Sequence, residues 1–240
     1  MLLLAIDSAT PVAGVALLED RRLLKEEFSN YKKTHAETLM PMVDRVMREC
    51  QCQVSDLDGI AISAGPGSFT GLRIGLATAK GLCLGSGKPL VAVSTLEMLA
   101  ANIGGIETLV CPILDARRNE VYAAIYMVTA GKPRSIHPPE AMDLETLVER
   151  IKDVNTGWEK AHCILVGDAL TRYEDYLRGA LGEAFLQAPP HLVLPRASAL
   201  ATLAMDKLQE GQTEDPFTLR PLYLRLSEAE VRRKKGECTC

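Results

Sequence analysis

The sequence predicts an α/β protein of two lobes, each a mixed sheet with helices on both faces. An apolar run that ends in a carboxylate and returns through a second apolar run occurs twice, beginning at Leu2 and at Leu109. In each half, strand-like and helix-like segments then alternate. The 240 residues, of which 47% are hydrophobic, fit two lobes more comfortably than one core.

The first half opens with three predicted strands in an antiparallel meander. Apolar runs at 2–7 and 12–18 are joined by the turn-forming residues 8–11. A turn at 19–20 leads into the third strand, at 21–28.

A helix over 34–50 follows, because Thr34 and Glu37 have the spacing of a capping box. Pro41 lies about two turns into it, so the helix must bend there or begin near residue 41. Strand and helix then alternate in the order strand, helix, strand, helix over 57–63, 69–85, 89–93 and 95–103.

The second half repeats this order more loosely. Strands are predicted at 109–114, 121–128 and 161–166, helices at 169–178 and 197–208, and loops at the proline pairs 138–139 and 189–190. The glycines at 104 and 105 mark the boundary, which gives lobes at 1–104 and 105–226 and a polar tail at 227–240 that we expect to be disordered. Duplicated lobes of this layout resemble the actin, Hsp70 and sugar-kinase superfamily.

Composition excludes several classes of protein. A net charge of −4 and a pI near 5.7 argue against a chain that binds nucleic acid alone, so another protein should hold any RNA substrate. No apolar run approaches the ~20 residues of a membrane span, and we expect a cytoplasmic protein. Seven scattered cysteines predict no disulfide, and the pairs Cys50/Cys52 and Cys238/Cys240 lack the second pair of a zinc site. No metal and no cofactor are expected.

The glycine-rich segment between the strand at 57–63 and the helix at 69–85 is the strongest local signal. Gly65, Gly67 and Ser68 could turn backbone N–H groups toward a phosphate or carboxylate at the helix start. The segment has neither a Walker nor a dinucleotide pattern. The alternative is that these glycines only form a tight turn.

Small residues along the helix at 69–85 suggest a close approach by another helix. Gly71, Gly75 and Ala79 recur every fourth residue, although an interior glycine costs on the order of 1 kcal/mol relative to alanine. The helix at 34–50 has a wide apolar stripe, formed by Leu39, Met40, Met42, Val43, Val46, Met47 and Cys50. Both features fit a partner surface, and both also fit packing within the lobe.

The first strand of each half ends in an aspartate, Asp7 in one and Asp115 in the other. Asp7 and Asp115 stand where nucleotide-dependent members of the superfamily keep a carboxylate that orients metal or water, or they form Asx turns. With Gly65, Gly67, Ser68 and Arg117 they make up a candidate anion or nucleotide loop. No catalytic Ser-His-Asp or Cys-His set can be assembled from spacing.

Several ordered motifs resemble the bacterial TsaB (YeaZ) family. They are Leu4–Thr10, His35–Pro41, Gly65–Arg73, Ala79–Leu82, Asp115–Arg117 and Tyr223–Arg225. The resemblance implies a subunit that binds the catalytic paralogue TsaD and, with it, TsaE. That complex moves threonylcarbamoyl from its adenylate onto the adenosine 3′ of the anticodon, so tRNA would be reached only indirectly.

One departure from TsaD bears on catalysis. TsaD-like proteins carry a His-x-x-x-His metal motif where this chain has Thr95 and Leu99, so the resemblance implies a non-catalytic scaffold. The expected partner interface comprises His35, Glu37, Leu39, Met42, Val43, Val46, Met47, Phe69, Thr70, Leu72, Arg73, Gly75, Leu76 and Ala79.

Two alternatives and two questions stay open. An enzyme could hold ATP and magnesium with Asp7, the segment 65–71 and Asp115, whereas a metalloprotease lacks ligands. The sequence leaves open whether the free chain forms a homodimer and whether a nucleotide lies at the interface.

Overall fold

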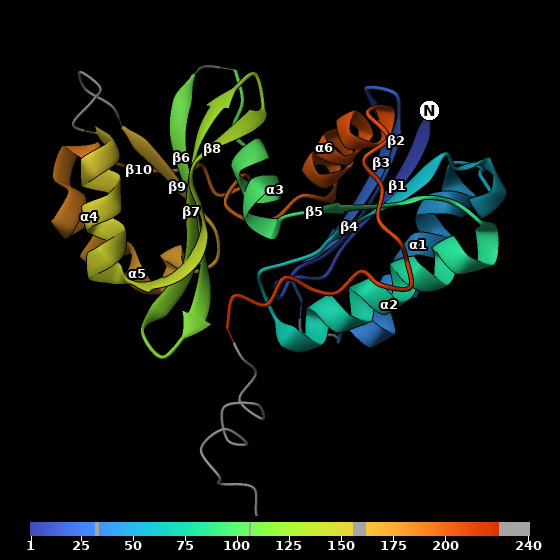
Figure 1. Ribbon diagram of the computed structural model, residues 1–240, viewed down its shortest axis with the longest axis horizontal. Helices are drawn as coiled ribbons and strands as arrows, with labels where there is room; N and C mark the ends of the chain where they lie inside the picture. Colours follow the sequence, from blue (N-terminus) through green and yellow to red (C-terminus); the bar gives the residue numbers. More distant parts are fainter. Residues whose placement is uncertain (32–33, 106, 156–161, 226–240) are drawn as a thin grey trace, which may run out of the picture.

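The computed structural model describes residues 1–31, 34–105, 107–155 and 162–225, which form two five-stranded mixed sheets (Figure 1). The first sheet has the order β3-β2-β1-β4-β5. Its strands are β1 (Leu2–Asp7), β2 (Ala13–Glu19), β3 (Arg22–Ser29), β4 (Gly59–Ser63) and β5 (Leu90–Val93). The predicted antiparallel meander is confirmed, and β1 also pairs in parallel with β4.

The second sheet repeats this topology in the order β10-β9-β6-β7-β8. Its strands are β6 (Thr108–Arg117), β7 (Glu120–Thr129), β8 (Lys132–Asp143), β9 (Cys163–Val166) and β10 (Phe185–Gln187). Strand β6 is antiparallel to β7 and parallel to β9, as β1 is to β2 and β4. The predicted duplication is therefore present in the sheets.

Helices cover both faces of each sheet. Helices α1 (His35–Glu49) and α2 (Phe69–Ser86) share a core with one face of the first sheet, and α4 (Leu144–Asn155) and α5 (Leu170–Leu181) with one face of the second. Helices α3 (Thr95–Ala101) and α6 (Ala197–Gln209) lie between the sheets (Figure 1). Short 3₁₀ turns occur at Val54–Asp56 and Gly182–Ala184.

The C-terminal part of the chain returns to the first lobe. The predicted boundary at residue 104 places α6 in the second lobe, whereas α6 packs against β1, β2, β4 and β5. After α6, the N–H of Leu222 donates to the Ala64 carbonyl at 2.7 Å, and Arg225 reaches the Ala116 carbonyl of the second lobe at 3.0 Å. The segment 210–225 therefore connects the two lobes by direct contacts.

One local prediction was confirmed and another was wrong. Helix α1 begins at His35 and contains Pro41, because the predicted capping box of Thr34 and Glu37 is formed. The pair Pro138-Pro139 lies in β8 and not in a loop. Strand β8 is an edge strand with register shifts opposite Ala123 and Ile125, where proline's missing N–H costs little.

Among the helices of the described ranges, none combines the length and apolar character that a bilayer crossing needs. The Cys238/Cys240 pair and the polar tail lie outside the described residues.

Candidate functional site

Asp7, at the end of β1, is completely buried. Its Oδ1 accepts a hydrogen bond from the Ser63 hydroxyl and another from the Ala9 N–H at 3.1 Å, which is the predicted Asx turn. Its Oδ2 is buried without a hydrogen-bond partner among the described residues. Burial raises the pKa of this carboxyl, and the Ser63 hydrogen bond opposes the rise. Asp7 therefore presents no oxygen to a ligand between the lobes.

Asp115 is the counterpart of Asp7 in the second sheet, but it is exposed. Its Oδ1 accepts from the Arg117 N–H at 2.8 Å, again in an Asx turn. Its own N–H donates to Oδ1 of Asp168, a residue that sequence reasoning missed, at 3.1 Å. Burial raises the pKa of Asp168. The sequence could have pointed to this residue by its place just after β9, beside Gly167. Within the described residues, no hydrogen bond joins Asp7 to Asp115.

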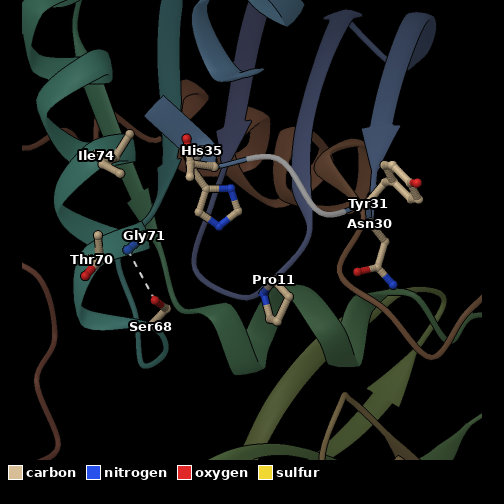
Figure 2. Close-up of a pocket in the computed structure, with 9 residues that line it drawn as sticks. Pro11, Asn30, Tyr31, His35, Ser68, Thr70, Gly71 and Ile74 are labelled. Atoms are coloured by element: carbon tan, nitrogen blue, oxygen red, sulfur yellow. Dashed lines mark hydrogen bonds between the residues drawn. The ribbon is translucent and has the colours of Figure 1, made fainter. Parts of the chain in front are cut away.

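The glycine-rich segment is filled by the chain itself. Gly65 has a φ of +116°, and a Cβ there would lie 2.7 Å from the Leu222 carbonyl oxygen. A Cβ at Gly67 would lie 2.1 Å from the carbonyl oxygen of Ala9. Ser68 caps α2 by accepting from the Gly71 N–H at 3.2 Å (Figure 2). These contacts favour the tight-turn interpretation over a phosphate cradle. The residues predicted to hold ATP and magnesium therefore do not form a site that fits those ligands.

The small residues of α2 face inward, which favours packing within the lobe over the alternative that they receive another protein's helix. A Cβ on Gly71 would lie 2.1 Å from the Ser8 carbonyl oxygen, and one on Gly75 would lie 2.2 Å from Ser8 Oγ. Ala79 is buried with them. The close neighbour is therefore the segment after β1 of the same lobe.

Most apolar members of the predicted interface also lie inside the first lobe. Seven are buried: Leu39, Met42, Val43, Val46, Met47, Leu72 and Leu76. Glu37, Thr70 and Arg73 are exposed, and His35 and Phe69 are half-buried. The wide stripe of α1 is explained by the core, so only the polar members and Phe69 reach the surface.

The side of α2 that faces away from the core is exposed, and its exposed residues after Arg73 are uncharged, whereas α1 also exposes charged residues. On α2, Ala77, Gly81 and Gly85 reach the surface, and a Cβ on either glycine would have no neighbour within 4 Å. Met40 on α1 is 46% exposed and Leu84 on α2 is 50% exposed. We call Met40, Ala77, Gly81, Leu84 and Gly85 the outer helix face. Sequence reasoning missed its α2 part, although Ala77, Gly81 and Gly85 recur every fourth residue.

A cavity of about 520 Å³ opens where α1 and α2 begin (Figure 2). Its wall includes Pro11, Asn30, Tyr31, His35, Ser68 and Thr70. His35 Nε2 lies 2.8 Å from the Thr10 carbonyl oxygen, a contact that needs the Nε2–H tautomer. Tyr31 is 76% exposed. The cavity therefore adjoins the surface formed by the starts of both helices.

The C-terminal segment is held at the start of α2 by an aromatic cluster. The rings of Phe69 and Tyr223 lie 4.9 Å apart, and the guanidinium of Arg73 lies 3.8 Å from the Phe69 centroid. Arg73 Nε donates to the Tyr223 hydroxyl at 3.1 Å. Two motifs far apart in the sequence, Gly65–Arg73 and Tyr223–Arg225, therefore form one surface.

The positions compared with a His-x-x-x-His metal motif are in the core between the lobes. Thr95 and Leu99 of α3 are both completely buried. Leu99 packs with residues of β6 and β7. Across the described part of the chain, no three metal-ligand side chains come together.

Comparisons with known proteins agree on one family. A family model described as TsaD, tRNA N6-adenosine threonylcarbamoyltransferase, matches residues 22–233. The tRNA threonylcarbamoyladenosine biosynthesis protein TsaB of Bacillus subtilis is 33% identical over 97% of this chain and 97% of its own length. The solved structure of YeaZ from Pseudomonas aeruginosa is 29% identical, with a TM-score of 0.74 over 93% of this chain and 99% of that chain.

A more distant likeness concerns the fold alone. The ROK hexokinase of Thermus thermophilus has a TM-score of 0.50 at 12% identity and covers 88% of this chain and 100% of its own. The predicted two-lobed fold of the sugar-kinase type is confirmed.

Proposed function

Because the chain belongs to the TsaB family, whose named members serve tRNA threonylcarbamoyladenosine biosynthesis, we propose that it is the non-catalytic subunit of the transferase complex. In this proposal it binds a TsaD homologue, and TsaE joins through that complex. The complex transfers threonylcarbamoyl from its adenylate to the adenosine 3′ of the anticodon. The observation that carries the proposal is the outer helix face.

The chemistry of the outer helix face supports a helical partner. Gly81 and Gly85 leave the backbone of α2 open, so another helix can approach closely. Met40 on α1 and Leu84 on α2 add flexible apolar side chains that are about half exposed. Thr70 and Arg73 supply polar groups at the N-terminal end of the same surface. An apolar centre with a polar margin is the usual composition of a protein interface.

The closed environment of Asp7 supports a non-catalytic role. A carboxylate that assists nucleotide chemistry must reach a metal, a water or a phosphate, and Asp7 has no exposed surface. The backbone of Ala9 and the carbonyl of Leu222 fill the space in front of Gly67 and Gly65. These contacts argue against the alternative of a nucleotide-dependent enzyme. The half-buried position of His35 also leaves it engaged with Thr10.

The proposal is tested by placing a large cation on the outer helix face. Gly81→Arg should abolish co-elution with the TsaD homologue on size-exclusion chromatography, because the side chain would project from the face that receives the partner. The matched control is Gly179→Arg on α5, which is also an exposed helical glycine with open space around it. Both variants should melt no earlier than the wild type, since replacing an interior helical glycine stabilises a helix by up to ~1 kcal/mol.

Two results would count against the proposal. If Gly81→Arg co-elutes as the wild type does, the partner does not use this face. If Gly179→Arg loses co-elution equally, the effect is one of added charge and not of position.

A further inference from the structure

The segment that follows α6 is attached to the first lobe along its length. The N–H of Glu214 donates to a carbonyl of β5 at 2.8 Å, and Leu219 packs against the core beneath α1 and α2. Further on, the N–H of Leu222 donates to the carbonyl that follows β4, and Tyr223 accepts a hydrogen bond from the first turn of α2. We call residues 214–225 the strap. Its position is therefore fixed relative to the first sheet.

The end of the strap reaches the second lobe through Arg225. Its Nη1 donates to the Ala116 carbonyl at 3.0 Å and lies 2.8 Å from Oε2 of Glu120. Both acceptors belong to the turn between β6 and β7, and Figure 1 shows this turn and the end of the described chain on the same, lower side of the view. Because Tyr223 is held two residues earlier, at most about 7 Å of chain separates the two attachments. The strap therefore has little slack where it joins the lobes.

The backbone of the β6–β7 turn leaves the Ala116 carbonyl available to the strap. The register of the ladder shifts between Asp115 and Arg117, so Ala116 pairs with no residue of β7. The next residues, Arg117, Arg118 and Asn119, have φ values of +63°, +55° and +61°, in the left-handed region that residues other than glycine rarely adopt. Strain of this kind persists where the surrounding structure holds it. The carbonyl left outside the ladder is the one that the strap binds.

The same turn is fixed within the second lobe. The N–H of Asp115 donates to Oδ1 of Asp168, which follows β9, at 3.1 Å. Arg172 of α5 donates to Asn119 Oδ1 at 3.1 Å and lies 3.8 Å from Asp115. A displacement of the turn would therefore displace β9 and α5 with it. Through Arg225, the strap holds the whole second lobe and not a loose hairpin.

A second contact between the lobes lies at the other end of β7. Lys132, which begins β8, has its Nζ 2.6 Å from Oδ2 of Asp206 on α6, and α6 packs on the first sheet. Lobes of one chain turn relative to each other unless contacts between them prevent it. The Lys132 side chain is 62% exposed, whereas that of Arg225 is 27% exposed and binds two acceptors. The contact of Arg225 is therefore the stronger restraint of the two.

We propose that Arg225 is a latch that keeps the two lobes closed at the end where the strap meets the β6–β7 turn. When its guanidinium leaves Ala116 and Glu120, the second lobe is free to turn away from the first at this end. The inference goes beyond the proposed function, because it concerns a motion of the chain by itself. Arg225 is a positioning residue, since it acts by fixing the β6–β7 turn relative to the start of α2.

The test measures the distance between the lobes in the full chain by double electron–electron resonance. Spin labels are attached through Asp44→Cys on α1 and Glu149→Cys on α4, two exposed positions on helices at opposite sides of the view in Figure 1. The cysteines of the core are buried and stay in place. The background replaces the others by serine, at Cys50, Cys52, Cys238 and Cys240.

The latch predicts one narrow distance distribution for the wild type. Arg225→Ala should raise the fraction of molecules at other distances about three- to tenfold, because an ion pair and a charge-assisted hydrogen bond together shift an equilibrium by about that factor. The matched control is Arg172→Ala. It removes an arginine that also binds the β6–β7 turn, but both of its partners, Asn119 and Asp115, belong to the second lobe. The control should match the wild type.

Several results would overturn the latch. They are an unchanged distribution in Arg225→Ala, an equal change in Arg172→Ala, and a wild type that is already broadly distributed. Thermal melts are compared first, so that a change of distance is not mistaken for unfolding. Should Arg225→Ala melt early, Glu120→Gln takes its place, because it removes the charge of the ion pair and keeps the arginine. Its distribution must then broaden in the same direction, and an unchanged one also overturns the latch.

Discussion

The hydroxyl of Ser8 occupies the space that a side chain at residue 75 would need: a Cβ on Gly75 would lie 2.2 Å from Ser8 Oγ. The same hydroxyl donates to the Gly71 carbonyl at 2.9 Å, so it is fixed in place. The segment after β1 and the helix α2 are thereby held in close contact. The glycines of α2 consequently belong to the fold of the first lobe, and its outer surface is free for other uses.

Enlarging residue 75 should therefore destabilise the protein. We expect Gly75→Ala to lower the free energy of unfolding by about 2 kcal/mol, because overpacking a tight contact costs roughly 1–3 kcal/mol and Ser8 must move. Gly81→Ala, on the open side of the same helix, should raise it by up to ~1 kcal/mol. Urea denaturation followed by circular dichroism measures both. Equal stability of the two variants would contradict the assigned packing.

The burial of Asp7 predicts a pH-dependent difference from Asp7→Asn. Burial raises the pKa of this carboxyl in the folded state, so the unfolded chain releases the proton at lower pH and wild-type stability falls as pH rises between the two pKa values. Asparagine has no charge to bury and can still accept from Ser63 and Ala9. The stability of Asp7→Asn relative to the wild type should therefore increase as the pH rises from 3, until the pH passes the raised pKa of the folded state. A constant difference in thermal melts across this range would contradict the prediction.

The aromatic cluster predicts how the C-terminal segment is held. Tyr223→Ala should lower the free energy of unfolding by about 1 kcal/mol, since it removes the ring contact with Phe69 and the hydrogen bond from Arg73. It should also speed cleavage within 210–225 in limited proteolysis. Tyr223→Phe keeps the ring and should lose less stability. Unchanged cleavage in Tyr223→Ala would show that Leu222 and Arg225 hold the segment without the ring.

The core cysteines should resist alkylation. Burial raises the pKa of the Cys83 thiol to about 11, and the pKa of the buried Cys111 is raised mainly by its hydrogen bond with Cys163. The thiolate is the reactive form, so iodoacetamide at pH 8 should leave both unmodified in the folded protein and modify both in urea. Peptide mass spectrometry measures the extent. Modification of Cys111 in the native protein would contradict its position in the second core.

The sheets could be predicted because their signal is local. The apolar runs that end at Asp7 and just before Asp115 predicted the first strand of each sheet. The capping box of Thr34 and Glu37 predicted where α1 begins, although Pro41 lies inside the helix. Strand β8 was missed because its proline pair resembles a loop, and only its place at the sheet edge makes the prolines harmless.

Which side of α2 faces the core of the lobe could not be predicted from the sequence. Small residues recur every fourth position on both sides of this helix, as Gly71, Gly75 and Ala79 and as Ala77, Gly81 and Gly85. Spacing alone cannot say which set faces the lobe. The approach of Ser8 decides it, and that contact joins residues more than sixty positions apart. The packing of α6 on the first sheet is long-range in the same sense.

We propose that this chain contributes a binding surface and not a catalytic group. It is tested most directly by tRNA threonylcarbamoylation in a reaction reconstituted with the TsaD homologue and TsaE. The account predicts that Asp7→Asn supports transfer within about twofold of the wild type, a barrier change below ~0.5 kcal/mol, whereas Gly81→Arg supports none. Loss of transfer in Asp7→Asn together with normal transfer in Gly81→Arg would contradict it.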